Sequence, residues 1–235
     1  VTQVTERDEF VYHEMLTHVP MLAHGNARRV LIIGGGDGGI LREVLRHPNV
    51  EQATMVEIDA GVVSFSREWL PTVSDGAFDD PRLNLVIADG AAFVRDTQDR
   101  FDVVIIDSTD PIGPGEVLFT DSFYGHVRRL LNPGGVVVTQ NGVPFLQPDE
   151  LRGTMRAFRS LFQVATCYLV TVPTYTGGPM ALGFGTDDAA LLHVSEPTLA
   201  ERLAGLDFTP GYYTPAVHRG AFALPGYVEK LVEPD

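Results

Sequence analysis

Cysteine and long apolar segments are scarce in this sequence. Cys167 is the single cysteine among 235 residues, so no intrachain disulfide can form. No apolar run approaches the roughly 18 residues that a membrane-spanning helix needs. The sequence does not open with a positively charged start followed by an apolar stretch, which is the pattern of a secretory signal. These features predict a cytoplasmic protein without a membrane segment.

Basic residues are also few compared with acidic ones. Lys and Arg total 17, Asp and Glu total 31, and the formal net charge is −14. Such a charge repels phosphate backbones and anionic membranes and favours cationic ligands. We therefore expect no nucleic-acid and no membrane partner. The histidines beyond the motifs described below show no metal-ligand spacing, and we predict no metal site: His18, His24, His47, His126, His193 and His218.

Short β-branched apolar runs alternate with helix-like stretches along the chain. Five such runs come first, at residues 29–33, 52–59, 83–89, 102–107 and 135–140. This alternation is typical of a parallel, doubly wound α/β sheet. Two later runs, 163–172 and 180–186, predict further strands that close the sheet. No repeat or low-complexity linker divides the chain, so we expect one domain over residues 1–235.

A glycine-rich loop follows the first predicted strand. GGGDGG, residues 34–39, satisfies G-x-G-x-x-G and by itself suggests a dinucleotide. Eighteen residues beyond Gly39, Glu57 ends the second strand, where a carboxylate accepts hydrogen bonds from ribose hydroxyls. Asp37 distinguishes a dinucleotide from an S-adenosyl compound. A carboxylate in this loop would repel the pyrophosphate of the first and attract the sulfonium of the second. The loop therefore favours an S-adenosyl ligand over NAD.

Acidic residues follow four of the predicted strands. Besides Asp37 and Glu57, Asp89 follows the third strand, and the pair Asp107 and Asp110 follows the fourth. Each one alone is consistent with a helix cap or a turn. Ligands of open α/β sheets bind at the carboxyl ends of the strands. Taken together, these acids predict a crevice that binds a cation.

Eight segments, in order across nearly the whole chain, resemble the spermidine synthases, which are polyamine aminopropyltransferases. They are TERDEFVYHEM, VLIIGGGDGG, MVEID, ADG, DSTDPIGPGEVLFT, QNG, VPTYTGGPMALGF and FALPGYVEKL. The resemblance implies a Rossmann-like sheet of the S-adenosylmethionine-dependent methyltransferase type. It also implies transfer of the aminopropyl group of decarboxylated S-adenosylmethionine to putrescine, giving spermidine and methylthioadenosine, in a homodimer.

The resemblance assigns roles to individual residues. Asp107 is implied to accept a proton and Asp110 to join it around the amine, and the division of labour between them stays open. The implied nucleoside site consists of Gly34, Gly36, Asp37, Glu57, Asp89, Gly90, Asp107 and Pro114. The implied amine site consists of Tyr12, His13, Asp37, Asp107, Ser108, Thr109, Asp110, Gln140 and Tyr175.

Paired carboxylates have a chemical use in this reaction. An alkyl amine with a pKa near 10.4 gives its proton to an ordinary aspartate, with a pKa near 3.9, only at a cost of about 9 kcal/mol. A second carboxylate and burial raise the pKa of the acceptor, while a nearby sulfonium lowers that of the amine. We therefore expect a raised pKa at the proton-accepting aspartate.

The chain departs from the family pattern in two places. Many members carry a glutamate shortly after the glutamine that Gln140 matches, whereas this chain has Gly142, so the preferred diamine stays open. Members also begin with a small β-rich domain that covers the cleft and supports subunit contact. Residues 1–235 do not contain that domain, and we expect weaker binding of the nucleoside substrate without it.

Other functions stay open on the sequence alone. An S-adenosylmethionine-dependent methyltransferase shares the sheet and Glu57, and needs room for a cofactor carboxylate near Asp37. A nucleoside-binding short form would keep the crevice without turnover. An NAD-dependent dehydrogenase is disfavoured by Asp37. Aminopropyl transfer explains Asp37, the two aspartates of DSTD (residues 107–110) and the VPTY loop (residues 172–175) together.

Overall fold

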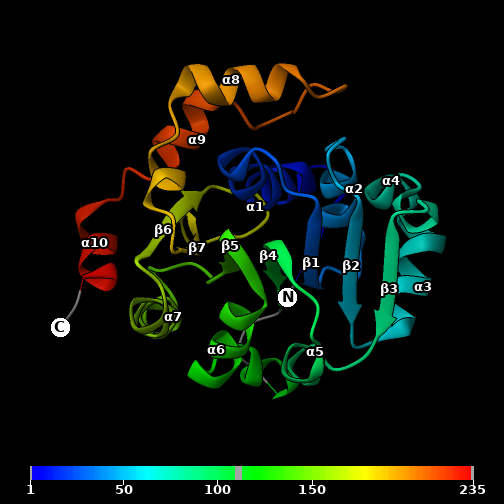
Figure 1. The fold of residues 1–235 in the computed structure, drawn as a ribbon, viewed down its shortest axis with the longest axis horizontal. Coiled ribbons are helices and arrows are strands. Elements are labelled where there is room, and N and C mark those ends of the chain that lie inside the picture. The colour runs from blue at the N-terminus through cyan, green and yellow to red at the C-terminus, as the bar shows by residue number, and fades with distance from the viewer. Residues whose placement is uncertain (1, 109–112, 234–235) are drawn as a thin grey trace.

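A seven-stranded sheet forms the centre of the computed structural model, which describes residues 2–108 and 113–233 (Figure 1). The strands lie in the order β3-β2-β1-β4-β5-β7-β6. The first five of these pair in parallel, and β7 pairs antiparallel with both β5 and β6. The predicted α/β class with a mostly parallel sheet is confirmed. The strands are β1 Arg29–Gly34, β2 Gln52–Glu57, β3 Leu83–Ile87, β4 Phe101–Asp107, β5 Leu131–Gln140, β6 Val164–Val170 and β7 Met180–Thr186.

Helices cover both faces of the sheet, because successive side chains of a buried strand point to opposite faces. In β1, Val30 and Ile32 pack into one core, while Leu31 and Ile33 pack into the other. Figure 1 shows α1 and α8 on one side of the sheet and α5, α6 and α7 on the other. The first group comprises α1 Glu9–His24, α2 Gly39–Leu45, α3 Ala60–Trp69, α8 Glu196–Ala204 and α9 Pro215–Ala221. The second comprises α5 Gly90–Asp96, α6 Asp121–Leu130, α7 Pro148–Leu161 and α10 Gly226–Val232.

Four short helices complete the secondary structure of the described residues. They are α4 Pro71–Ser74 and the 3-10 helices η1 Ala77–Asp79, η2 Gly113–Phe119 and η3 Ala189–His193. None of the helices in residues 2–108 and 113–233 has the length and apolar character that crossing a membrane requires.

Helix α1 is buried along most of its length. Every side chain from residue 11 to residue 23 is buried, and the helix packs against α2, β4 and β5. It ends at Gly25, whose positive φ of 78° lets its N–H group donate to the Met21 carbonyl oxygen. The helix is therefore fixed on all sides, and its first turns hold Tyr12 and His13 near the carboxyl ends of β1 and β4.

The loop after β1 needs glycine where the chain passes other groups closely. A Cβ atom on Gly36 would lie only 2.9 Å from Glu57 Oε2, so the lack of a side chain allows this close approach. Gly38 has a φ of 82° and precedes the first residue of α2. These glycines bring the backbone against the end of β2, where the predicted site lies.

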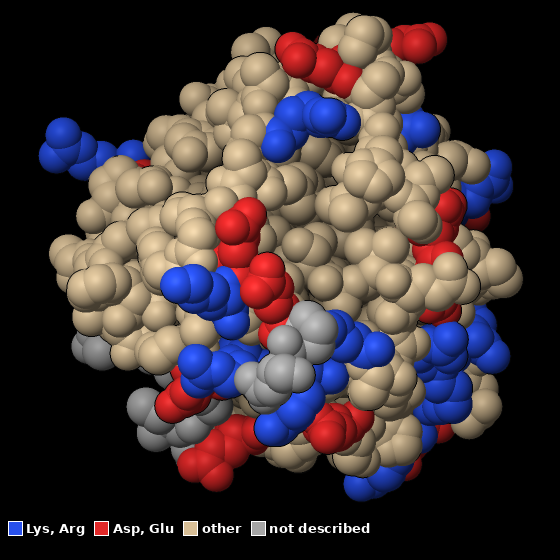
Figure 2. Space-filling view, turned by 90° about the vertical axis from the view of Figure 1, so that its left-hand side faces the viewer, with Lys and Arg blue, Asp and Glu red and all other residues tan. Residues whose placement is uncertain are grey.

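Charged side chains of both signs lie next to one another on the face drawn in Figure 2. Over the whole chain, acidic residues outnumber basic ones, and the formal net charge is −14.

Candidate active site

The carboxyl ends of β1, β2, β3 and β4 bring four predicted acidic residues to one edge of the sheet. Asp37 lies in the loop after β1, Glu57 ends β2, Asp89 follows β3 and Asp107 ends β4. Since β1 lies between β2 and β4, the glycine loop is flanked by Glu57 on one side and Asp107 on the other. The structure therefore brings these four acids to one edge of the sheet.

Asp107 combines burial with nearby negative charge. Its Oδ1 accepts a hydrogen bond of 2.6 Å from the Tyr12 hydroxyl. Burial and the charge of Asp37 raise the pKa of Asp107 to about 6, although His13 and Tyr12 oppose the rise. A carboxyl group with this pKa is a much better proton acceptor for an amine than an ordinary aspartate is.

Asp37 has the opposite electrostatic environment. Its Oδ1 accepts a hydrogen bond of 2.8 Å from the Gly39 N–H group, and its Oδ2 lies 3.4 Å from His13 Nε2. Burial acts to raise the pKa of Asp37, but the contacts with His13 and Gly39 outweigh it, and the pKa is lowered. Asp37 is thus an anion at neutral pH beside a second carboxyl group that titrates much higher.

His13 lies between acidic groups. Its Nδ1 is 2.5 Å from Glu9 Oε2, and its side chain is 2% exposed. Burial acts to lower the pKa of His13, but the facing carboxylates of Asp37 and Glu9 raise it to about 10. His13 is therefore an imidazolium at neutral pH, and its charge acts to lower the pKa of both Asp37 and Asp107.

Glu57 is a buried carboxylate beside the glycine loop. Its Oε1 accepts a hydrogen bond of 3.0 Å from the Asp59 N–H group, and its Oε2 faces Gly36. Asp59 in turn accepts a hydrogen bond from the Gly61 N–H group and caps the start of α3. The end of β2 and the start of α3 thus hold the Glu57 carboxylate in place.

Asp89 directly precedes α5 and caps its first turn. Its Oδ1 accepts hydrogen bonds from the N–H groups of Ala91 at 2.8 Å and Ala92 at 3.2 Å. A Cβ atom on Gly90 would lie 2.6 Å from Ile33 Cγ2, so the helix starts tight against β1. Asp89 is therefore a helix cap, as its position in the sequence allows. It lies at the same edge of the sheet as the other acids.

Gln140 and Ser108 lie next to the end of β4. The Gln140 amide donates a hydrogen bond of 2.9 Å to the Ser108 carbonyl oxygen and accepts one of 2.9 Å from Gly142 N–H. The Ser108 hydroxyl is buried without a hydrogen-bond partner among the described residues. The Gln140 side chain thus fixes the backbone where the chain leaves β4.

Tyr175 reaches the site from the loop between β6 and β7. Its ring makes an edge contact with Tyr12, at 6.0 Å between centroids. Its hydroxyl donates a hydrogen bond of 2.5 Å to the Gln3 carbonyl oxygen. The two tyrosines line a small cavity together with His13.

Three residues of the predicted site cannot be placed in full. Thr109 and Asp110 lie outside the described residues. Pro114 belongs to η2, but its side chain is not among those described. The pairing of Asp107 with Asp110 stays a prediction. The sequence did not predict that the charge of Asp37 raises the pKa of Asp107.

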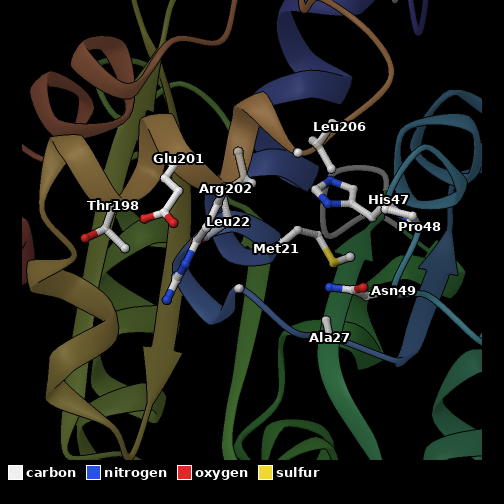
Figure 3. A pocket seen from close by; sticks show the side chains of 12 residues that line it. Met21, Leu22, Ala27, His47, Pro48, Asn49, Thr198, Glu201, Arg202 and Leu206 are labelled. Atoms are coloured by element: carbon white, nitrogen blue, oxygen red, sulfur yellow. The ribbon is translucent and has the colours of Figure 1, made fainter.

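A cavity of about 510 Å³ lies elsewhere, between α1, α8 and the segment after α2 (Figure 3). Its lining includes Met21, His47 and Arg202, and none of the residues that the sequence predicts for the site. Ala27 precedes β1 and Asn49 precedes β2, so this cavity is at the amino ends of those strands. Ligands of such sheets bind at the carboxyl ends. The candidate active site is therefore at the carboxyl ends of the strands, where Asp37, Glu57 and Asp107 lie.

Two further residues of this region went unnoticed in the sequence. Glu9 contacts His13, and Arg42 on α2 binds both Glu9 oxygens at 2.9 Å. The spacing of Glu9 and His13, four residues apart on a helix, was the available signal. Within residues 2–108 and 113–233, no three His, Cys, Asp or Glu side chains are arranged to hold a metal ion.

Comparison with known proteins decides the family. The family model described as the spermine/spermidine synthase domain matches residues 9–193. The chain belongs to the spermine/spermidine synthase family. A polyamine aminopropyltransferase of Ruegeria sp. (strain TM1040) is 68% identical over 98% of this chain and 81% of its own length. Polyamine aminopropyltransferase 1 of Pseudomonas aeruginosa is 58% identical over 99% of this chain and 81% of its own length.

Solved structures agree with this family. A spermidine synthase in complex with the transition state analogue AdoDATO superposes with a TM-score of 0.92 and 41% identity, covering 99% of this chain and 78% of that one. Spermidine synthase from Thermotoga maritima gives a TM-score of 0.89 and 39% identity, covering 99% and 77%. The family and the aminopropyltransferase activity that the sequence motifs indicate are confirmed.

Proposed function

We propose that this aminopropyltransferase uses decarboxylated S-adenosylmethionine as donor and putrescine as acceptor, and releases spermidine and methylthioadenosine. The observation that carries the proposal is the difference between two neighbouring carboxyl groups. Asp37 has a lowered pKa, while the pKa of Asp107 is raised to about 6. One group is suited to hold an ammonium ion, and the other is suited to take a proton.

The donor would lie along the edge formed by β1, β2 and β3. Glu57 would accept hydrogen bonds from the ribose hydroxyls, and Gly34 and Gly36 would leave room for the nucleoside. Asp89 and Gly90 would border the adenine, and Pro114 the thioether. Asp37 would bind the ammonium end of the aminopropyl group. A donor that retained its carboxylate would meet repulsion at Asp37, which favours the decarboxylated compound.

The acceptor amine must lose a proton before it attacks. With the pKa of Asp107 at about 6, transfer from an amine of pKa near 10.4 costs about 6 kcal/mol, compared with about 9 kcal/mol for an ordinary aspartate. The neighbouring sulfonium and desolvation of the amine would reduce this cost further. Tyr12 would steady the Asp107 carboxyl group through its hydrogen bond.

The bond changes then balance without a further reactant. The nitrogen lone pair forms the new carbon–nitrogen bond at the carbon beside the sulfonium. The carbon–sulfur bond breaks, and its electrons stay on sulfur, so neutral methylthioadenosine leaves. Asp107 holds the proton. The pocket for the distal amine would be formed by Ser108, Thr109, Asp110, Gln140 and Tyr175. The Asp110 carboxylate would help to balance the positive charge of that amine.

We also propose that the protein works as a cytoplasmic homodimer, with residues 1–235 as one catalytic domain. The support is the family resemblance together with the single, buried Cys167. Light scattering on a size-exclusion column tests the assembly, because a homodimer has twice the 25.6 kDa mass of one chain.

Calorimetric binding tests the choice of donor. Decarboxylated S-adenosylmethionine and S-adenosylmethionine should differ at least about tenfold in Kd, with the decarboxylated form bound more tightly. The variant Asp37→Asn should remove most of that difference, because it removes the charge that repels the carboxylate. Equal affinities in the wild type would contradict the proposed donor.

A further inference from the structure

Glu9 of α1 joins His13 to Arg42 of α2. Its Oε2 lies 2.5 Å from His13 Nδ1. Its two oxygens accept hydrogen bonds of 2.9 Å from the two terminal nitrogens of Arg42. The Glu9 side chain is 10% exposed, so this bridge between α1 and α2 is largely shielded from water.

Arg42 is itself held firmly. Its Nε donates a hydrogen bond of 2.8 Å to Glu43, and one terminal nitrogen donates a bond of 2.6 Å to the Val73 carbonyl oxygen. The Arg42 side chain is 8% exposed. A bidentate pair between a fixed guanidinium and a carboxylate restricts the carboxylate to one orientation. The position of Glu9 is therefore defined by α2 and by the segment at Val73.

Both ring nitrogens of His13 face carboxylates. Nδ1 faces Glu9 at 2.5 Å, and Nε2 faces Asp37 at 3.4 Å. A neutral imidazole has one N–H group and one bare lone pair, so it would turn a lone pair toward one of the two anions. The geometry is satisfied by the doubly protonated ring. Asp37 thereby gains a cationic neighbour that Glu9 keeps in place.

Building on the proposed aminopropyl transfer, we propose that Glu9 is a positioning residue that holds His13 protonated and oriented against Asp37. It acts through His13, and Arg42 fixes it in turn. The groups that face His13 come from each element packed around it: Glu9 and Tyr12 from α1, Asp37 from the glycine loop, Asp107 from β4, and Arg42 from α2 behind Glu9.

The consequence of losing Glu9 depends on pH. In the wild type, His13 keeps its proton well above neutral pH. Glu9→Gln removes one of the carboxylates that raise the pKa of His13, whereas Asp37, which contributes more to the rise, stays in place. The pKa should therefore fall from about 10 part of the way toward its ordinary value near 6.5. The variant then loses imidazolium as pH rises toward 8.5, whereas the wild type keeps it. A residue that only stabilised the fold would lower activity by the same factor at every pH.

The test compares Glu9→Gln with Glu43→Gln. Glu43 is buried and binds the same Arg42, and it also pairs with His18 and Arg46, but it does not contact His13. Glu43→Gln therefore changes one buried carboxylate and leaves the contacts of His13 in place. The activity is kcat/KM for amine-dependent methylthioadenosine release, divided by the wild-type value at each pH. For Glu9→Gln this ratio should fall by about tenfold between pH 6 and pH 8.5. For Glu43→Gln the ratio to the wild-type kcat/KM should be the same at every pH, even if the variant is less active than the wild type.

A second measurement does not depend on activity. Nuclear magnetic resonance of the imidazole carbons, with His13→Gln to assign the signal, should show His13 protonated throughout pH 6 to 8.5 in the wild type. In Glu9→Gln the same signal should titrate within that range. If the wild type does not release methylthioadenosine, the proposed function is wrong. The titration of His13 then still tests whether Glu9 keeps that ring protonated.

Three results would overturn the positioning role. One is a level ratio for Glu9→Gln across the pH range. Another is a His13 signal that is unchanged in that variant. The third is a wild-type His13 that is neutral at pH 7.5, which decides the question even if Glu9→Gln does not fold.

Discussion

Asp107 of β4 lies opposite Gly34 of β1 in the parallel ladder, and a Cβ atom on Gly34 would come within 2.0 Å of the Asp107 carbonyl oxygen. Gly34 also has a φ of 84°, which side-chain-bearing residues rarely adopt. The absence of a side chain at Gly34 therefore allows the proposed proton acceptor to lie directly beside the glycine loop.

The variant Gly34→Ala should lose about 3 kcal/mol of stability or more, because it adds a clash with backbone atoms to the cost of the positive φ. Gly76→Ala is the matched control. Gly76 has a φ of 81°, but a Cβ atom there meets nothing within 4 Å, so only the backbone cost of about 1 kcal/mol remains. Urea unfolding of both variants measures the difference. Equal losses would show that the close approach at Asp107 has no energetic weight.

Asp107→Asn should lower turnover by about 10² to 10⁴-fold, because the amide cannot accept the proton of the amine. The asparagine oxygen can still accept the hydrogen bond from Tyr12, so the pocket should keep its shape. Methylthioadenosine should therefore bind with nearly unchanged affinity, as measured by calorimetry. Turnover close to that of the wild type would remove Asp107 from the mechanism.

The same substitution should change stability in a pH-dependent way. Burial and Asp37 raise the pKa of Asp107 to about 6 in the folded protein, so the ionised carboxylate disfavours folding above that pH. Below the unfolded pKa, near 3.9, the penalty vanishes. Asp107→Asn should thus be more stable than the wild type by about 2 to 3 kcal/mol at pH 7.5, and no more stable at pH 3.5. Denaturant unfolding at the two pH values checks this, and a gain at pH 3.5 equal to that at pH 7.5 would contradict it.

Activity should decline on the acidic side with the titration of Asp107. Since the ionised form takes the proton, kcat/KM should fall by about tenfold for each pH unit below about 6. Tyr12→Phe removes a hydrogen bond that lowers the pKa of Asp107, so this decline should move to higher pH by about one unit.

The control for that shift is Tyr175→Phe. The Tyr175 hydroxyl donates to the Gln3 carbonyl oxygen and not to a carboxylate, so its removal should leave the position of the acidic decline unchanged. A pH profile of Tyr12→Phe that coincides with that of Tyr175→Phe would mean that the Tyr12 hydrogen bond does not set the ionisation of Asp107.

The sequence predicted the strands and the acids that follow them because buried parallel strands are continuous apolar runs and ligands bind at their carboxyl ends. The strands β1, β2, β3 and β4 follow the predicted runs within two residues. The antiparallel placement of β7 between β5 and β6 was not predicted. A short apolar run carries no information about the direction or partner of a strand.

The unforeseen parts of the site depend on contacts between distant residues. Glu9 and Arg42 are 33 positions apart, and their ion pair exists because α1 packs on α2. Gln140, which the family resemblance placed in the amine site, donates to the Ser108 backbone, 32 positions away, and that contact was not predicted. Residue types and spacing identify candidates, whereas tertiary packing decides which side chains meet.

Aminopropyl transfer is best measured by quantifying methylthioadenosine and spermidine after mixing the protein with decarboxylated S-adenosylmethionine, with and without putrescine. With putrescine, both products should form in equal amounts, and without it neither should form. Release of methylthioadenosine that does not depend on an amine, or binding of both substrates without any product, would contradict aminopropyl transfer.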